Sequence, residues 1–254
     1  MARLVVSAIF TLALTTAPAF AQSGAPPRTW VDKDTGHWVI RLTDEPGSSG
    51  FYFNVNAYTP DNKTMVFTAP DGIHVMDMAS RKTRLLVANP PSTASSSPGT
   101  ARSGVHAVVV GHKTNSVFYT QFDAATKSST IYSANTDTGA VTKYAALPPG
   151  VSIASINADE TLAAATMNEK PTAAPEYGAN RVNPPGTAPG PLVQPQNKGE
   201  MMEQRLAART PLILFTINLQ TGKMTTLLHS TDWVNHLLFS PTDPTLLMYC
   251  HEGP

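Results

Sequence analysis

The sequence is poor in the residues that build disulfides, zinc sites and strongly charged surfaces. Its 254 residues include one cysteine, Cys250, which excludes an internal disulfide framework and a cysteine-rich metal site. A lone thiol in a chain of this size is most often a buried strand residue, and we expect this of Cys250. Charged residues make up 14%, below the roughly 25% of an ordinary soluble protein. We expect an exported β protein with a surface of Ser, Thr, Asn, Gly and Pro.

The charges also balance, because 18 basic residues face 18 acidic ones. No net field would therefore recruit nucleic acid or an anionic membrane. An anionic ligand must be bound by a local group of cations.

The sequence has no apolar run of about 20 residues, the length that a membrane-spanning helix needs. Its N-terminus instead combines Arg3, an apolar stretch from Leu4 to Leu14, and the small-x-small sequence Ala19-Phe20-Ala21. This pattern is typical of a Sec-type signal peptide, residues 1–21, cut after Ala21. We predict a periplasmic or secreted mature chain, residues 22–254, that has no membrane contact after cleavage.

A repeat of short strands and turns fills most of the mature chain. One unit spans residues 56–87, a second spans 108–147, a third begins at 155 and resumes at 211–230, and "NHLLFSPTDPTLLMYC" starts another. Each unit holds four strands, and their turns contain Pro, Asp, Asn or Gly. Such units at a period of about 40 to 50 residues are the signature of β-propeller blades. The Ala-rich stretch Leu162–Ala165 stands where the second strand of a blade belongs.

Two stretches interrupt this rhythm. Residues 89–104 form a polar Pro/Ser loop, and residues 170–205 form a Pro/Gly-rich insertion. Gly199–Arg209, at the end of the second stretch, is the one convincing helical window of the mature chain. The insertion is either a surface elaboration or a roof over the central channel, where propellers bind ligands.

The number of blades raises the question of ring closure. We predict an all-β chain with about three to four blades, an incomplete ring, whereas propellers usually close with 4 to 8 blades. The last predicted strands run from His236 to Phe239 and from Leu246 to Cys250, so the expected last blade has two strands. We therefore expect the chain to be the N-terminal part of a longer protein.

Two segments resemble a known family. Thr35–Thr68 and Trp233–Pro254 are similar to the oligogalacturonate lyases, pectin-degrading enzymes built on a seven-bladed β-propeller, and "CHEGP" at Cys250–Pro254 is among the most specific parts. The resemblance implies β-elimination of oligogalacturonides, which leaves a 4-deoxy unsaturated uronate end. The exported address departs from the best-known members, which act in the cytoplasm.

The resemblance also implies a divalent metal, typically manganese, held by histidines and a glutamine. Those ligands are expected beyond Pro254, so we assign no metal residue here. We accordingly predict that the 254 residues alone lack lyase activity.

The same resemblance suggests a base and a cation. The base must remove the proton beside the substrate carboxylate, and histidine suits this task. We predict His236, which we expect to open its strand and point to the channel mouth, with His251 as the alternative. For each, the competing interpretation is a histidine that orders a turn. Arg209 is predicted to pair with a carboxylate of the substrate, because a guanidinium binds a carboxylate in a bidentate fork, and the competing interpretation is a solvated arginine at the end of a helix.

Two further arginines are candidates for substrate binding. Arg205 precedes Arg209 in the same segment, and Arg41 lies in the shared motif "VIRLTDEPG", where it could instead pair with Asp44 or Glu45. The remaining histidines show no metal-ligand spacing and are expected to be structural. They are His37, His74, His106, His112 and His229.

Other classes of protein remain open. The chain could be a non-catalytic TolB-like periplasmic propeller that binds sugar or protein, or the propeller domain of a peptidase. No GxSxG, P-loop or GxGxxG motif is present.

Overall fold

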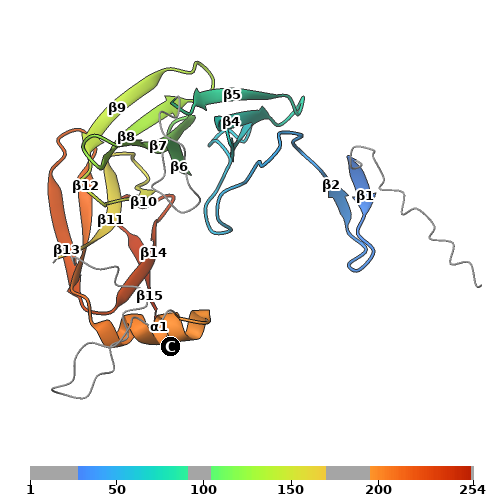
Figure 1. Ribbon diagram of the computed structural model, residues 1–254. Coiled ribbons are helices and arrows are strands. Elements are labelled where there is room, and N and C mark those ends of the chain that lie inside the picture. Colours follow the sequence, from blue (N-terminus) through green and yellow to red (C-terminus); the bar gives the residue numbers. More distant parts are fainter. Residues whose placement is uncertain (1–27, 91–103, 170–194, 253–254) are drawn as a thin grey trace, which may run out of the picture. The chain divides into compact units, whose positions relative to one another are not determined.

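The computed structural model describes residues 28–90, 104–169 and 195–252 (Figure 1). The predicted signal peptide, most of the two predicted insertions, and Gly253 and Pro254 lie outside these residues. The chain divides into two compact units, Met1–Leu42 and Thr43–Pro254, each of which is described by itself.

The first unit contains one β-hairpin. Strand β1 (Thr29–Val31) pairs antiparallel with β2 (Trp38–Ile40). The turn between them is ordered by Asp32, whose carboxylate accepts hydrogen bonds from the N–H and the hydroxyl of Thr35 at 2.8 and 2.7 Å. Gly36 completes the turn with a φ of 71°, a conformation that favours glycine.

The second unit begins with two antiparallel sheets in chain order. The first is β3 (Thr64–Ala69), β4 (Gly72–Asp77) and β5 (Thr83–Ala88). The second is β6 (Val105–Val110), β7 (Ser116–Asp123), β8 (Ser128–Asn135) and β9 (Val141–Ala146).

A second four-stranded sheet and a two-stranded one follow. The former is β10 (Ile153–Ile156), β11 (Leu162–Asn168), β12 (Leu212–Asn218) and β13 (Met224–Ser230). The latter, called the half-blade below, is β14 (Trp233–Phe239) and β15 (Leu247–Glu252). Within the described residues the chain is therefore all-β with propeller blades, as predicted: three blades and the start of a fourth.

Two details differ from the sequence-based prediction. The first blade has no regular innermost strand within the described residues, where two isolated bridges, Ser49 to Thr68 and Tyr58 to Met65, stand in its place. The half-blade strands extend further than expected. Because β14 begins at Trp233, His236 lies inside this strand and does not open it.

The predicted helical window is confirmed as α1 (Lys198–Ala208). Asn197 caps its N-terminus by accepting a hydrogen bond from the Glu200 N–H at 3.0 Å, and Arg209 ends it in the left-handed conformation with φ 45°. Among the described residues, no helix has the length and apolar character needed to cross a membrane.

The core lies between neighbouring blades. Val66 and Ile73 pack against Val117, and Ile131 and Phe215 belong to a second cluster, between the two four-stranded sheets. A third cluster joins the last full blade to the half-blade through Leu214, Val234 and Phe239, among others. Each blade thus buries its apolar faces on the next one, the arrangement that makes propellers stable as arrays.

Polar contacts connect the same neighbours. The Asn115 amide donates to Asp61 at 3.1 Å, and Glu160 accepts from the N–H and hydroxyl of Thr114 at 2.8 and 2.7 Å. The Asn157 amide donates to the Pro244 carbonyl at 3.2 Å. Each of these contacts joins the turn between the first two strands of a blade to the corresponding turn of the next, which aligns the blades.

Candidate functional site

The half-blade and α1 together carry four of the five predicted site residues. His236 and His251 lie on β14 and β15, Arg205 lies on α1, and Arg209 is its C-cap. The helix leads directly into β12, which packs beside the half-blade. Arg205 thereby reaches Trp233 on β14, and Arg209 reaches Asp232, the residue before this strand. Arg41 follows β2 in the first unit, where its N–H donates to the Arg28 carbonyl at 2.8 Å.

His236 occupies a β-bulge. On β14, His236 and Leu237 lie between Asn235, which pairs with Cys250, and Leu238, which pairs with Met248. Two residues of β14 therefore oppose one of β15. His236 has φ 48°, a left-handed conformation that is uncommon for a non-glycine residue. A bulge redirects the side chain of the extra residue, and strain of this kind gathers at functional sites.

Asp232, the residue before β14, contacts two predicted site residues. Its carboxylate forms an ion pair with Arg209 and lies 2.9 Å from His251 Nε2. One carboxylate thus positions a guanidinium and an imidazole together, although α1 and β15 are far apart in sequence.

Glu252 likewise positions the imidazole of His236. Its Oε1 lies 2.9 Å from His236 Nε2 and accepts a longer hydrogen bond, at 3.5 Å, from Asn235. The imidazole of His236 also stacks on the ring of Tyr52, at 5.7 Å between centroids and 10° between planes. The side chains of His236 and Glu252 are 34% and 17% exposed, so this pair is more enclosed than that of His251, which is 62% exposed.

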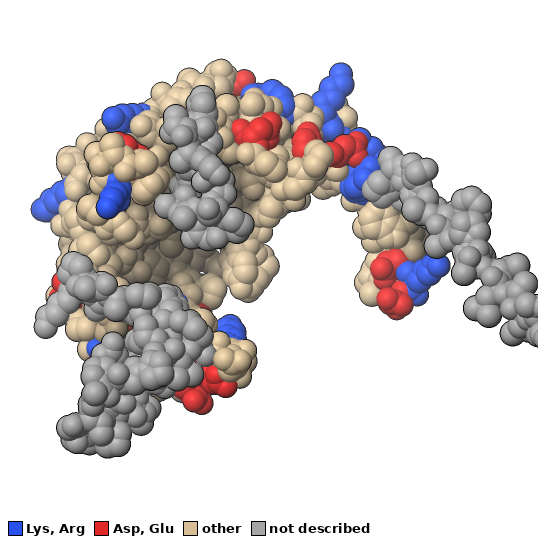
Figure 2. All heavy atoms as spheres, viewed as in Figure 1, with Lys and Arg blue, Asp and Glu red and all other residues tan. Residues whose placement is uncertain are grey.

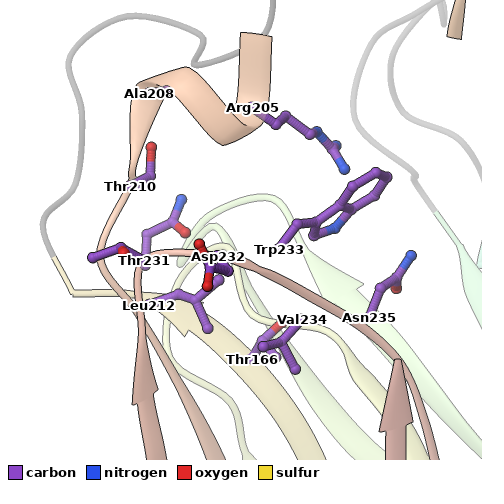
Figure 3. A pocket seen from close by; sticks show the side chains of 11 residues that line it. Thr166, Arg205, Ala208, Thr210, Leu212, Thr231, Asp232, Trp233, Val234 and Asn235 are labelled. Atoms are coloured by element: carbon purple, nitrogen blue, oxygen red, sulfur yellow. The ribbon is translucent and has the colours of Figure 1, made fainter. Parts of the chain in front are cut away.

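A pocket of about 230 Å³ opens between α1 and the start of β14. Figure 3 shows the Arg205 side chain reaching from the helix toward the Trp233 ring, with Asp232 and Asn235 in the same wall. The Arg205 guanidinium carbon lies 3.5 Å from the ring centroid, a cation–π contact. Burial lowers the pKa of the Arg205 guanidinium, and the Glu252 carboxylate opposes this. A partly desolvated guanidinium gains from any further carboxylate that enters.

The pocket thus joins an aromatic ring, a cation and the Asp232 carboxylate, which pairs with His251, whereas His236 and Glu252 lie outside its lining residues. Such a ring can take the apolar face of a sugar, and guanidinium groups can bind its carboxylate. An imidazole held by a carboxylate is oriented to accept a proton with its other nitrogen.

The partners of the predicted residues were not themselves predicted from the sequence. Asp232, Trp233 and Glu252 were not singled out, and neither was Tyr52, which comes from the segment before β3. Asp232 and Trp233 could have been found from their position directly before "VNH". Predicting their pairings, however, requires the register of β14 on β15. The expectation for Cys250 was wrong in part: it lies on a strand but is exposed, because β15 has β14 alone as a strand partner among the described residues.

Two of the other histidines have carboxylate partners of their own. His74 is buried, with Nε2 2.7 Å from Asp71 and its ring stacked on Phe67. His229 pairs with Glu169 at 2.9 Å. The structural role expected for these histidines stays a prediction.

The described residues do not fit a metal centre. Within residues 28–90, 104–169 and 195–252, no three or more His, Cys, Asp or Glu side chains gather closely enough to hold an ion. His236 with Glu252, and His251 with Asp232, each offer two groups. No chemical step is therefore assigned to a metal here.

Charge is scattered over the visible face of the molecule. Figure 2 shows small separate groups of Lys and Arg and of Asp and Glu on a largely uncharged surface. The local cations of the pocket therefore matter more for an anionic ligand than the charge of the surface as a whole.

Comparison with known proteins gives one short sequence match and two matches in fold. No family model matches the chain. It is 42% identical over 41 residues, 16% of this chain and 11% of the relative, to an oligogalacturonate lyase of Dickeya dadantii (strain 3937).

Two solved structures share the fold. One is an oligogalacturonate lyase from Vibrio parahaemolyticus, with 17% identity and a TM-score of 0.58, and it matches 89% of this chain and 53% of its own. The other is an oligogalacturonate lyase in complex with manganese, with 18% identity, a TM-score of 0.59 and the same coverages. The chain therefore spans about half the length of these structures. The resemblance to oligogalacturonate lyases inferred from sequence is confirmed.

Proposed function

We propose that this chain contributes the substrate-binding and proton-transfer part of an oligogalacturonate lyase. The observation that carries the proposal is that residues from α1, β14 and β15 meet around Asp232, Trp233 and Glu252, on a fold that the solved lyases share. The substrate would be an oligogalacturonide, an acidic sugar chain.

The cations would bind its carboxylates. The Arg205 guanidinium covers one face of Trp233, so a uronate carboxylate that binds this guanidinium would bring the sugar to the edge of the indole. Arg209 is already paired with Asp232 and would serve as a second contact. The C5 proton is barely acidic while the adjacent carboxylate keeps its negative charge. Neutralising this carboxylate makes the proton more acidic, which is why the reaction needs the cations.

The base would then take this proton. The C5–H electrons form the C4–C5 double bond, the C4–O bond breaks, and the leaving oxygen receives a proton. His236 is our first choice, because it lies in a strained bulge and Glu252 orients its ring. His251 is the alternative, oriented by Asp232.

Two further parts of the proposal depend on other residues. A divalent metal, such as the manganese of one solved lyase, would be held by ligands outside the described residues. The signal-like N-terminus leads us to propose a periplasmic or secreted location, where longer pectin fragments are available.

Binding tests the proposal directly in the chain as it stands. Trigalacturonate should change the tryptophan fluorescence saturably, whereas the neutral trisaccharide of galactose should not. Arg205→Gln should weaken trigalacturonate binding about tenfold, through loss of a charge-assisted contact. Trp233→Phe should remove most of the signal, because Trp30 and Trp38 lie in the other unit.

A matched control separates the site from general electrostatics. Arg84→Gln removes a cation whose guanidinium donates to the Thr136 carbonyl, outside the residues that line the pocket. Equal weakening in Arg84→Gln and Arg205→Gln, or equal binding of the neutral sugar, would contradict the proposal. Binding without any unsaturated product, even in a longer protein that contains this chain and is supplied with manganese, would favour the non-catalytic alternative.

A further inference from the structure

The imidazole of His236 is held at one edge and on one face. Its Nε2 lies 2.9 Å from Glu252 Oε1, and its plane is 10° from that of the Tyr52 ring, with 5.7 Å between the centroids. This is an offset stack, an arrangement that aromatic rings prefer. An ionised carboxylate only accepts hydrogen bonds, so Nε2 carries the proton of the neutral imidazole. The other nitrogen, Nδ1, then has the free electron pair.

The backbone at His236 makes these side-chain contacts necessary. His236 lies in the bulge of β14 with φ 48°, where the ladder of hydrogen bonds to β15 is interrupted. A residue in a bulge is less restrained by its strand than its neighbours are. The contacts with Glu252 and Tyr52 therefore decide where the imidazole points.

Tyr52 lies on a turn that the core anchors on both sides. The Val55 N–H donates to the Tyr52 carbonyl at 2.9 Å, which closes the turn. Phe51 packs against the cluster between the first two sheets of the unit, and Val55 packs against the cluster between the two four-stranded sheets. The turn is therefore held independently of His236, and the Tyr52 ring is a fixed surface for the imidazole.

His74 makes the same two contacts in a sealed place. Its Nε2 lies 2.7 Å from Asp71, and its ring stacks on Phe67. Its side chain is 7% exposed, and its Nδ1 is buried without a hydrogen-bond partner. His236 instead follows Asn235, a residue that lines the pocket. The chain thus provides a structural counterpart against which the contacts of His236 can be measured.

We propose that Tyr52 is a positioning residue which, together with Glu252, fixes the His236 ring so that Nδ1 is the nitrogen that removes the substrate proton. This role rests on the proposed function, in which His236 is the base, and it adds the accepting atom and the residue that holds the ring. The proton moves from C5 to Nδ1, and its bonding electrons stay with the substrate. The resulting imidazolium is stabilised by the Glu252 carboxylate and by the face of the Tyr52 ring.

Nitrogen NMR of the chain with isotope-labelled histidine tests the accepting atom. His236→Gln identifies the His236 signals by their loss. At alkaline pH the ring proton of His236 should lie on Nε2. Glu252→Ala should speed the exchange of this proton with water about tenfold, because a charge-assisted hydrogen bond is lost. A proton on Nδ1 in the unmodified chain would overturn the proposal.

The counterpart histidine supplies the matched control for this measurement. Asp71→Ala removes the carboxylate partner of His74 and should leave the exchange at His236 unchanged. Equal acceleration at His236 in Asp71→Ala and Glu252→Ala would mean that general loosening of the fold, and not the Glu252 contact, governs the exchange. That result would overturn the proposal.

The same spectra test the role of Tyr52. The face of an aromatic ring shifts nearby protons upfield, so the carbon-bound ring protons of His236 report the stack. Tyr52→Leu should remove this shift and let the imidazole take more than one orientation, whereas Tyr52→Phe should retain both because it keeps the ring. Phe53→Leu is the matched control, since the Phe53 ring contacts that of Tyr52 at 4.6 Å between centroids. Equal changes in Phe53→Leu and Tyr52→Leu would exclude Tyr52 as the positioning residue.

Trigalacturonate connects the orientation of the ring with the reaction. Its addition should shift the Nδ1 signal of His236, because C5 must approach this atom, and should leave the proton on Nε2. Arg205→Gln should require about tenfold more trigalacturonate for the same shift. Saturable binding with an unchanged Nδ1 signal would overturn the role of Nδ1 and leave the binding part of the proposed function intact. Absence of binding would refute the proposed function itself, and with it the role of Nδ1, even where Nε2 keeps its proton.

Discussion

The blade β10–β13 and the half-blade β14–β15 begin with the same kind of hairpin but differ in what covers it. Both first strands carry a bulge shortly before the turn, at Ala154 in β10 and at His236 and Leu237 in β14. In the full blade the second strand is sealed by β12, and Ala163–Ala165 are fully buried. In the half-blade most of the second strand is exposed.

This difference teaches where chemistry can reside in a repeat. A strand sealed on both sides must be apolar or small, because buried polar groups need partners. The sealed strand β11 accordingly carries the fully buried Ala163–Ala165, whereas the bulge of β14 carries a histidine that a carboxylate can reach.

The largest effect is expected in the sealed core. Phe215 is fully buried between the two four-stranded sheets, and Phe215→Ala should lower the free energy of unfolding by about 3–5 kcal/mol. Tyr249→Ala, on β15, should change it by less than about 0.5 kcal/mol in a monomeric preparation. Denaturant titration measures both, and equal losses would mean that β15 is as well buried as β12.

The contact that attaches the half-blade should matter next. The buried hydroxyl of Ser155 accepts a hydrogen bond from the Phe239 N–H at 3.0 Å. Ser155→Ala leaves this N–H without its partner and should cost about 1–3 kcal/mol. Hydrogen exchange should show the loss in β14 and β15 before the full blades. Ser152→Ala, at an exposed position, is the control, and uniform acceleration throughout the unit would refute a local attachment.

The turn between the third and fourth strands of a sealed blade should have a smaller effect on stability, through the backbone conformation. Gly222 has φ 70°, so Gly222→Ala should destabilise by about 1 kcal/mol through the left-handed conformation. The new methyl group would meet Ala145 at an ordinary 3.5 Å, so packing adds little. Arg81→Gly at the equivalent position, φ 57°, relieves the same strain and should not destabilise. Thermal denaturation of both variants tests the pair.

The smallest effect is expected in the pH dependence of stability. Burial lowers the pKa of His112 below its ordinary 6.5, and the Glu160 carboxylate opposes this. The folded chain therefore binds this proton less readily than the unfolded chain. Stability from this group should be complete above the ordinary pKa and should fall as pH drops from about 7 to about 5. His112→Asn should flatten that part of the denaturation profile, and an unchanged slope would exclude His112 as its source.

Much of the fold could be predicted from the sequence. The turns that contain Pro, Asp, Asn or Gly and the helix before β12 lie where the residue pattern predicted them. Such features depend on neighbouring residues, whose side chains bond the local backbone. The first blade was harder, since its innermost segment forms isolated bridges in place of a regular strand.

The site was predictable only in part. Arg205, Arg209, His236 and His251 came from a resemblance, and their functional roles stay predictions. The bulge at His236 could not be predicted, because it depends on which residue of β14 opposes which residue of β15. A shift of one residue in this register would turn the side chains to the other face.

The amino-acid sequence alone therefore decided the periodic strands, the turn chemistry and the scarcity of charge, because each follows from residue type and short-range geometry. Tertiary structure decided that Asp232 joins Arg209 to His251, that Glu252 orients His236, and that Tyr52 stacks on its ring. These contacts connect segments far apart in the chain, and the packing of one blade on the next holds them together.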